Sequence, residues 1–465
     1  MYAAGIAMMP PRGRETGWAT PVARTFVVVL SLNAVFFILA IWVARLPREP
    51  FVARVREAFA IGELGNNDYL PFDSHRGYHQ YNDCLILQMI MNSDHAVLAN
   101  TVAPLVYVAN VDTWNDQCAT LRQLIDKPQD RSQYASRRYA RYWHGYNPVV
   151  AALLLKFNLT DVRRALKLAV YAALVVLVAT AGGANRPLFA AVAAIAATGA
   201  AFWGIPYFGQ SLHDGPGDTF VVLGIASFLL FRKHLSRTAT FVPFCAAYGA
   251  SLAYLEMFTG LLPTGAAWMF AVAYLAVASS PHLDTTLRHA WTFAIAGLIA
   301  MTLGAAATVA IKLALSVMFL GHEAANVFAG HLKVYMSPYA GPDGSATVIA
   351  PFAALIRAGS GLTYGSRSGA TVLFGGAALA WLVALYLTLR RHSLRRSSDF
   401  LAFIVAAAAM PLWVLLFQYH TGVHAFLTVR LFIIPISLGL AAVVWQLSVS
   451  RDATVCSGAT VESGL

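Results

Sequence analysis

The stretch TFVVVLSLNAVFFILAIWVAR, residues 25–45, decides the fold class of this chain. It carries no charge before Arg45, and its length matches the ~20 residues that a helix needs to cross a ~30 Å hydrocarbon core. Basic residues precede it at Arg12, Arg14 and Arg24, but the apolar run is too long for the core of a signal peptide. We therefore predict a first membrane span that the mature protein keeps.

The composition of the whole chain agrees with this reading of its first helix. Of the 465 residues, 58% are hydrophobic and only 12% are charged, which is about half the charged fraction of a soluble domain. Lipid must therefore be part of the solvent. The net charge of +11 comes largely in short clusters beside apolar stretches, as in the cytoplasmic loops of membrane proteins, and no long basic and aromatic patch suggests nucleic acid as a partner.

Apolar stretches of near-spanning length recur along the chain and predict an all-α polytopic membrane protein of about ten transmembrane helices. The predicted spans are 25–45, 164–183, 187–204, 218–232, 238–255, 262–280, 290–314, 369–389, 400–418 and 428–448. With the N-terminus inside, the basic clusters at 232–237 and 390–396 both fall in the cytoplasm, as the positive-inside rule requires. Both termini are then cytoplasmic, and we expect a multi-pass protein of the bacterial inner membrane.

The predicted layout has three parts. Residues 1–24 and 449–465 form cytoplasmic tails, and 25–448 form the transmembrane domain. Within that domain, a large periplasmic loop at 46–146 and a second long segment at 315–368 fall on the outer side. The outer segments hold most of the polar side chains, including Asp68, Asp73, His75 and His79 of the first loop. The inner loops are short and basic, so we expect function at the outer membrane–water boundary.

The first candidate site lies in GYHQYNDCLILQMIMN, residues 77–92. Asn82 or Asp83 could cap an amphipathic helix that lies on the bilayer surface, with Asp83 at headgroup depth. A carboxylate there could accept a proton or bind a metal, although a helix cap without chemistry is an equally simple reading. Cys84 of this segment and Cys118 could pair in an oxidising periplasm, or each could be an ordinary buried thiol.

The second candidate lies in RYWHGYNPVVAALLLKF, residues 141–157. Its aromatic residues suit a membrane interface, and Pro148 can start a short apolar helix that cannot span. His144 and Tyr146 are candidates for binding a phosphate or a sugar hydroxyl, and a structural role is the alternative for such interfacial residues.

The third candidate is HDGPGD, residues 213–218. Its glycines and proline predict an irregular turn between two spans. His213, Asp214 and Asp218 on one turn resemble a site for a divalent cation or a hydroxyl group, which leaves the cofactor and metal requirement open. The alternative is a solvated loop in which Asp218 caps the next helix.

The fourth group of candidates carries positive charge or imidazole rings near the outer ends of later spans. Arg430 at the start of the last span, and Lys312 near the end of an earlier one, could clamp a lipid phosphate or could reach toward the headgroups without a ligand. His420 and His424 stand in the outer turn just before Arg430.

Taken in their order along the chain, these features resemble the GT-C class of integral-membrane glycosyltransferases, mainly over residues 25–235. The variant His144-Gly145-Tyr146-Asn147-Pro148 looks like the class's His-Pro-Pro-Leu motif, and NLTDVRRALKL at 158–168 is similar to its Ala-Leu-Arg-Leu stretch. The His-Pro-Pro core is altered, and no acidic pair follows the first span directly. The resemblance implies Asp83 as the early acidic residue and Asp214 or Asp218 as the acid of the second outer loop.

The resemblance also implies the reaction. A hexosyl or pentosyl group would pass from a polyprenyl-phosphate donor in the membrane to a glycan or lipid acceptor of the cell envelope. Asp83, Asp214 and Asp218 are the predicted catalytic residues, and the remaining candidates bind substrate: His144, Asp68, His213, Tyr146, Lys312, His420, His424 and Arg430. Two alternatives remain, a transporter or lipid flippase and a non-catalytic subunit for envelope assembly. The oligomeric state is left open.

Overall fold

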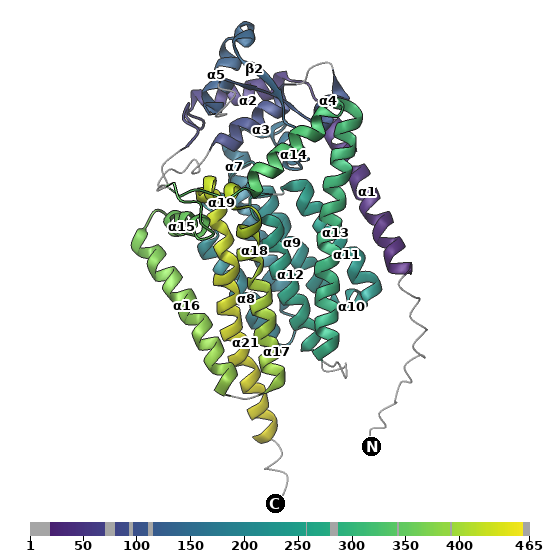
Figure 1. The fold of residues 1–465 in the computed structure, drawn as a ribbon, viewed down its shortest axis with the longest axis vertical. Helices are drawn as coiled ribbons and strands as arrows, with labels where there is room; N and C mark the ends of the chain where they lie inside the picture. The colour runs from purple at the N-terminus through teal and green to yellow at the C-terminus, as the bar shows by residue number, and fades with distance from the viewer. Residues whose placement is uncertain are drawn as a thin grey trace, which may run out of the picture.

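The computed structural model describes residues 19–69, 80–92, 96–109, 115–256, 258–279, 287–341, 344–390 and 393–458. Asp73, His75 and His79 lie outside the described residues. The described chain is mostly helical, with one short two-stranded sheet. The helices form an elongated bundle, and the 46–146 segment sits on one end of it (Figure 1).

Eight of the described helices are long and apolar enough to cross a membrane. They are α1 (Ala19–Ala44), α7 (Leu159–Ala181), α11 (Thr238–Leu255), α12 (Leu261–Ala278), α13 (Leu287–Leu320), α16 (Arg367–Arg390), the pair α17 (Leu394–Ala407) and α18 (Ala409–Leu416), and the helix that ends in α21 (Ile433–Gly458). The outward faces of α1 and α16 expose large apolar side chains such as Phe26, Ile38, Val372 and Leu382. Such faces need lipid to cover them. The chain is a multi-pass membrane protein.

Two of the ten predicted spans form helices that are shorter than the other eight. These are α8 (Arg186–Phe202) and α9 (Asp214–Leu230), each of 17 residues. A helix of that length is roughly 26 Å long, slightly less than the ~30 Å core. Both pack inside the bundle, α9 against α7 and α8 against α21.

Helices α11 and α13 approach each other at glycines. A side chain at Gly249 would collide with the main-chain carbonyl of Met301, and one at Gly304 would collide with that of Ala246. Small residues permit this kind of close backbone packing between membrane helices, where van der Waals contact replaces the hydrophobic effect. Helix α1 packs against both members of this pair.

The 46–146 segment folds into a small layer of its own over one end of the bundle (Figure 1). Its elements are α2 (Glu49–Ala60), α3 (Tyr81–Met91), α4 (Val97–Val102), β1 (Leu105–Val108), α5 (Gln117–Asp126), η1 (Pro128–Gln133) and β2 (Ala135–Arg138), and α6 (Tyr146–Leu154) follows. The strands pair antiparallel with Leu105 opposite Arg138. As predicted, α6 starts near Pro148 and is too short to span.

The prediction that α3 lies on the bilayer surface is wrong. Every residue from Asp83 to Met91 is buried, and α3 packs against α2, α5, α6 and β1. Its N-cap is Gln80, so neither Asn82 nor Asp83 caps it. Apolar residues on all sides of a helix indicate burial rather than an interface. Cys84 and Cys118 form a disulfide that ties α3 to α5.

The second long segment and the last turn lie beside this layer. α14 (Glu323–Met336), α15 (Ala350–Arg357) and η2 (Ala358–Thr363) lie within residues 315–368. α19 (Gln418–Val423), α20 (Ala425–Thr428) and η3 (Val429–Phe432) lead into α21. α19 contacts α14 and α15, α20 contacts α15, and η3 contacts η2. A single turn, α10 (Arg232–Leu235), joins α9 to α11 at the opposite end of the bundle (Figure 1).

Candidate functional site

Asp83 is held in a buried ion pair with Arg163 of α7. Oδ2 of Asp83 accepts hydrogen bonds from Nε of Arg163 at 3.1 Å and from its Nη2 at 2.5 Å. The same guanidinium donates to Glu63 through Nη1 at 2.9 Å. Oδ1 of Asp83 accepts from the main-chain N–H of Leu212 at 2.8 Å. Both carboxylate oxygens of Asp83 are therefore engaged by donors of the protein itself.

A second buried ion cluster surrounds Arg430. Its Nη1 lies 3.2 Å from Oδ1 of Asp214, and its Nη2 donates to Oδ2 of Asp218. Its planar group also lies over the rings of Trp203 and Phe208, at 5.4 and 4.8 Å from their centroids. Two carboxylates around one guanidinium offset part of the cost of burying charge. In this arrangement, protein side chains already occupy the guanidinium group with which Arg430 would bind a ligand.

The start of α9 positions Asp214 and Asp218 on the same side of one helical turn. The predicted irregular turn at Gly215-Pro216-Gly217 is wrong, because these residues are helical. Proline is tolerated in a first turn, where no partner awaits its missing N–H. A side chain at Gly215 would collide with the carbonyl of Gly209, and one at Gly217 would collide with Leu261. The glycines thus allow close packing, and Asp218 lies inside the helix rather than at its cap.

His213 connects the Arg430 cluster to the 46–146 segment. Its Nδ1 lies 3.1 Å from Oδ1 of Asp214, and its ring lies 4.9 Å from the ring of Tyr146. Burial alone would lower the pKa of His213, but the charge and hydrogen bond of Asp214 outweigh it, so the pKa is raised above its usual value. An imidazole held by a carboxylate is the arrangement of a proton-transferring histidine.

His144 adjoins the same ring system but is held neutral. Its Nδ1 lies 2.8 Å from the Tyr146 hydroxyl, and its Nε2 lies 3.0 Å from the carbonyl oxygen of Tyr139. Burial, with the nearby charge of Lys312, lowers the pKa of His144 to about 3. Its backbone has a φ of 57°, which is rare for a histidine and costs of order 1–3 kcal/mol. The surrounding structure therefore fixes this side chain.

Lys312 of α13 is buried, and no carboxylate of the described residues lies within ion-pair distance of its ammonium. Its ammonium donates to the main-chain carbonyl of Val102 and, at 3.1 Å, to the hydroxyl of Ser316. It also lies 5.5 Å from the centroid of the Trp143 ring. Because neutral groups hold it, an arriving anion would not need to displace a carboxylate from Lys312.

Three other polar candidates occupy separate positions. Asp68 accepts the main-chain N–H groups of Gln117 and Cys118, and so caps α5. His420 lies between Tyr335 and His424, at 4.6 and 4.7 Å between ring centroids. Burial and the neighbouring His424 hold the pKa of His420 well below its usual value. Asp68 therefore lies at the start of α5, and His420 and His424 lie next to α14.

The Asp83 and Arg430 clusters meet at the segment before α9. Asp83 accepts a hydrogen bond from the main-chain N–H of Leu212, the residue next to His213, and His213 contacts Asp214 of the Arg430 cluster. Sequence reasoning missed Arg163, although an arginine within an apolar span is itself a signal of a buried partner. It also missed Asp399, a buried carboxylate of α17 bonded to Tyr274 and Trp445.

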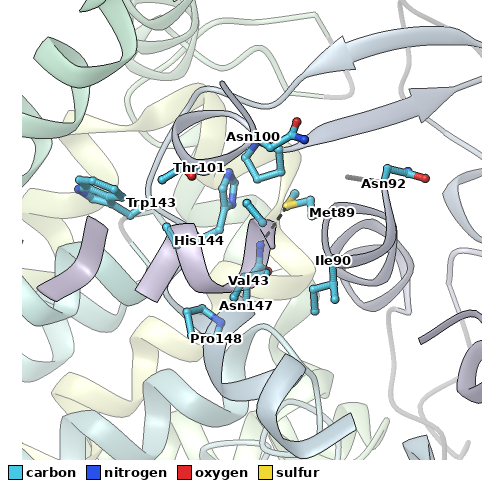
Figure 2. Close-up of a pocket in the computed structure, with 13 residues that line it drawn as sticks. Val43, Met89, Ile90, Asn92, Asn100, Thr101, Trp143, His144, Asn147 and Pro148 are labelled. Atoms are coloured by element: carbon cyan, nitrogen blue, oxygen red, sulfur yellow. Dashed lines mark hydrogen bonds between the residues drawn. The ribbon is translucent and has the colours of Figure 1, made fainter. Parts of the chain in front are cut away.

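A small cavity of about 20 Å³ lies next to His144. Its walls come from the end of α1, from α3, α4 and α6, and from the Trp143–His144 turn (Figure 2). It is lined by Ala40, Val43, Ala44, Met89, Ile90, Asn92, Asn100, Thr101, Pro104, Trp143, His144, Asn147 and Pro148. Over the part of the chain that the structure describes, no three His, Cys, Asp or Glu side chains are arranged to hold a metal ion.

No family model matches this chain, and the comparisons with curated proteins and with solved structures also find no match.

Proposed function

We propose that this protein is a membrane glycosyltransferase that takes a sugar from a polyprenyl-phosphate donor and transfers it to an acceptor hydroxyl of the cell envelope. The observation that carries the proposal is the buried cluster of His213, Asp214, Asp218 and Arg430. Perturbed ionisable groups of this kind concentrate at functional sites. The likeness of residues 25–235 to the GT-C class supplies the reaction type.

The proton of the reaction goes to the His213–Asp214 pair. As the acceptor oxygen forms its bond to the anomeric carbon of the sugar, His213 takes the hydroxyl proton and Asp214 stabilises the resulting imidazolium. The bond between that carbon and the phosphate oxygen breaks, and the polyprenyl phosphate leaves with the bonding electrons. Asp218 and Arg430 hold Asp214 in place.

Lys312 supplies charge for the leaving phosphate. Among the cationic candidates, it is the one bound only to neutral oxygens, whereas Arg430 and Arg163 are already paired with carboxylates. A buried ammonium is worth more to a developing anion than one in water, because the surroundings screen it less. Asp83 then acts as a positioning residue that fixes the segment before α9.

The proposed topology places this site at the outer surface of the bacterial inner membrane, with both termini in the cytoplasm. The Cys84–Cys118 disulfide supports an outer location for the 46–146 segment, because disulfides persist in oxidising compartments such as the periplasm. The ten-helix count includes α8 and α9 as short spans within the bundle.

Transfer assays with purified protein in nanodiscs and a radiolabelled polyprenyl-phosphate sugar test the proposal. We expect Asp214→Asn and His213→Gln to lower kcat by about a hundredfold or more, the usual range for loss of an acid–base group. Asp399→Asn is the matched control, since Asp399 is equally buried but bonds to Tyr274 and Trp445. We expect full activity per folded molecule for this variant.

Two results would refute the proposal. Full transfer activity in folded Asp214→Asn would show that the assigned site is wrong, even though the protein catalyses the reaction. Wild-type protein that transfers sugar from no polyprenyl-phosphate donor, yet moves such lipids across sealed vesicles, would instead identify a flippase.

A further inference from the structure

An open groove of about 480 Å³ lies on the two-stranded sheet of the 46–146 segment. Tyr107 of β1 stands opposite Ser136 of β2. The next pair on the same face is Leu105 opposite Arg138, and all four residues line this β1–β2 groove. Successive side chains of a strand point to opposite faces, so Val106 faces the interior, where it is fully buried. Figure 1 shows β2 on the side of the layer that is away from the bundle, so a ligand reaches the groove from water.

Arg131 of η1 brings a positive charge to the groove without a counterion. The central carbon of its guanidinium lies 5.8 Å from the centroid of the Tyr107 ring. Its Nε and Nη2 are covered by protein and make no hydrogen bond, and no carboxylate of the described residues pairs with this guanidinium. Covered donors without partners are unfavourable on their own. An anionic ligand that supplies acceptors to Arg131 therefore gains more than one that meets a fully hydrated arginine.

A second guanidinium lies on the floor of the same groove. The Nη1 of Arg138 donates to Oδ1 of Asn100 at 3.0 Å and to the carbonyl oxygen of Ala103 at 3.2 Å. These bonds to neutral oxygens hold the group in place and leave its charge uncancelled. The side chains that line the groove thus include two cations and no carboxylate, and Asp130 of η1 is not among them. The groove is complementary to negative charge.

The other lining residues narrow the chemistry of the ligand. Ser132 and Ser136 carry hydroxyl groups, which both donate and accept hydrogen bonds as the hydroxyls of a sugar do. Tyr107 and Tyr134 offer ring faces against which the C–H groups of a sugar can pack. A guanidinium matches a carboxylate or a phosphate with two parallel hydrogen bonds. The volume of the groove also falls within the roughly 300–1,000 Å³ of small-molecule sites.

We propose that the β1–β2 groove binds an acidic sugar, a monosaccharide unit that carries a carboxylate or a phosphate. Arg131 and Arg138 hold the anionic group, and the serine hydroxyls and tyrosine rings hold the sugar ring. The inference goes beyond the proposed function and rests on it in one respect only, that the bound sugar is then an acidic unit of the acceptor glycan. Binding itself requires no turnover.

Thermal unfolding of the whole protein in phosphatidylcholine nanodiscs tests the proposal without measuring transfer. The probes are glucuronic acid and glucose 6-phosphate, with glucose and inorganic phosphate as comparisons at equal ionic strength. A ligand that binds only the folded protein raises Tm by mass action. We expect at least one acidic sugar to bind at least tenfold more tightly than both glucose and phosphate. The difference from glucose should shrink as salt is added, because salt screens charge.

A pair of arginine variants separates the groove from the general charge of the layer. Arg131→Gln should weaken binding of the effective acidic sugar about tenfold or more. Its ligand-free Tm should be kept, because the Arg131 side chain makes no hydrogen bond within the described residues. Arg137→Gln is the matched control. It removes the same charge from an exposed position of β2 that does not line the groove, so binding should be kept.

A third variant fills the groove while both lining arginines stay in place. Ser136 is exposed on the floor of the groove, so Ser136→Trp adds bulk without disturbing the buried side of the sheet. We expect it to abolish the rise in Tm with every sugar probe.

The outcomes decide between the inference and its alternatives. Equal affinity for glucose and both acidic sugars would overturn it, and so would inorganic phosphate that binds as tightly as glucose 6-phosphate when glucuronic acid does not bind. Equal binding by Arg131→Gln and Arg137→Gln would also overturn it. Acidic-sugar binding by a protein that shows no transfer activity would leave the inference standing and reject the proposed function. Transfer activity without such binding would do the reverse.

Discussion

The residue types of the site could be predicted from the sequence, but their partners could not. Asp214, Asp218 and Arg430 were each recognisable as charges next to apolar segments, and the fold brings them together from positions more than 200 residues apart. Asp83 is predicted as a catalytic residue from its place at the start of an apolar helix and from the resemblance to the GT-C class. Its true environment depends on Arg163 and Leu212, and no local pattern records those distant contacts.

At the same scale, burial of neutral His144 makes the protein sensitive to acid. The folded protein keeps His144 unprotonated down to a pKa of about 3, whereas the unfolded chain protonates near 6.5. Between these values the unfolded state binds more protons, so stability falls as pH falls. We expect His144→Asn to remove this loss, on the order of 2 kcal/mol at pH 5. Asparagine tolerates the positive φ of this position.

The measurement for His144 is chemical unfolding of both proteins in mild detergent from pH 8 to pH 4. Wild-type stability should drop more steeply than that of His144→Asn below pH 6.5. Parallel curves over the whole range would contradict the assignment of a buried neutral imidazole.

At the scale of elements, helices were predictable and their surroundings were only partly so. The apolar runs gave nearly every long helix, because backbone hydrogen bonds must be satisfied within a segment in lipid. Helix α3 shows the limit, since the sequence CLILQMIMN suits a membrane surface as well as the interior of a folded layer. Helix α3 is buried in the folded layer because α2 and α5 cover it. The start of α9 was predicted as an irregular turn for a similar reason, because its glycines, which permit close packing, are also typical of turns.

The link between α3 and α5 gives a prediction about this layer. The disulfide closes a loop with a sequence separation of 34 residues, for which chain-entropy arguments give about 2–4 kcal/mol of stabilisation. We expect Cys84→Ser/Cys118→Ser to lower the free energy of unfolding of the 46–146 segment by that amount. Limited proteolysis should then cut the segment faster in the double variant.

A reductant provides the internal comparison for the disulfide. It should make wild-type protein as sensitive to protease as the double variant, while a Cys245→Ala variant, which alters a free buried cysteine, keeps the wild-type response. Equal proteolysis of oxidised wild type and double variant would show that α3 and α5 are held by packing alone.

At the scale of the whole molecule, the fold class of a polytopic membrane protein was predictable, because composition and hydropathy are properties of the entire chain. The count of spans was less predictable, since eight of the described helices are long and apolar enough to cross a bilayer, while α8 and α9 have only 17 residues each. Orientation rests on a sum of weak charge preferences at 232–237 and 390–396. Together, these two basic clusters predict one topology, which can be tested.

Labelling of single cysteines checks the topology directly. Arg122→Cys in α5 and Arg237→Cys beside α10 both replace exposed side chains, at opposite ends of the bundle. We expect a membrane-impermeant maleimide to label Arg122→Cys in intact spheroplasts, and Arg237→Cys only after the membrane is opened. Labelling in the reverse order would invert the proposed orientation and place the candidate site in the cytoplasm.

The partners of Asp83 have a consequence for the synthesis of the chain. Arg163 lies 80 residues after Asp83, and Leu212 lies 129 residues after it. At ordinary translation rates the ribosome needs on the order of ten seconds to add the first of these intervals. During that time, α3 has emerged without the cation that neutralises its carboxylate. The layer over the bundle therefore reaches its final form only after α7 has entered the membrane, so the last step in shaping the site belongs to assembly rather than to the segment itself.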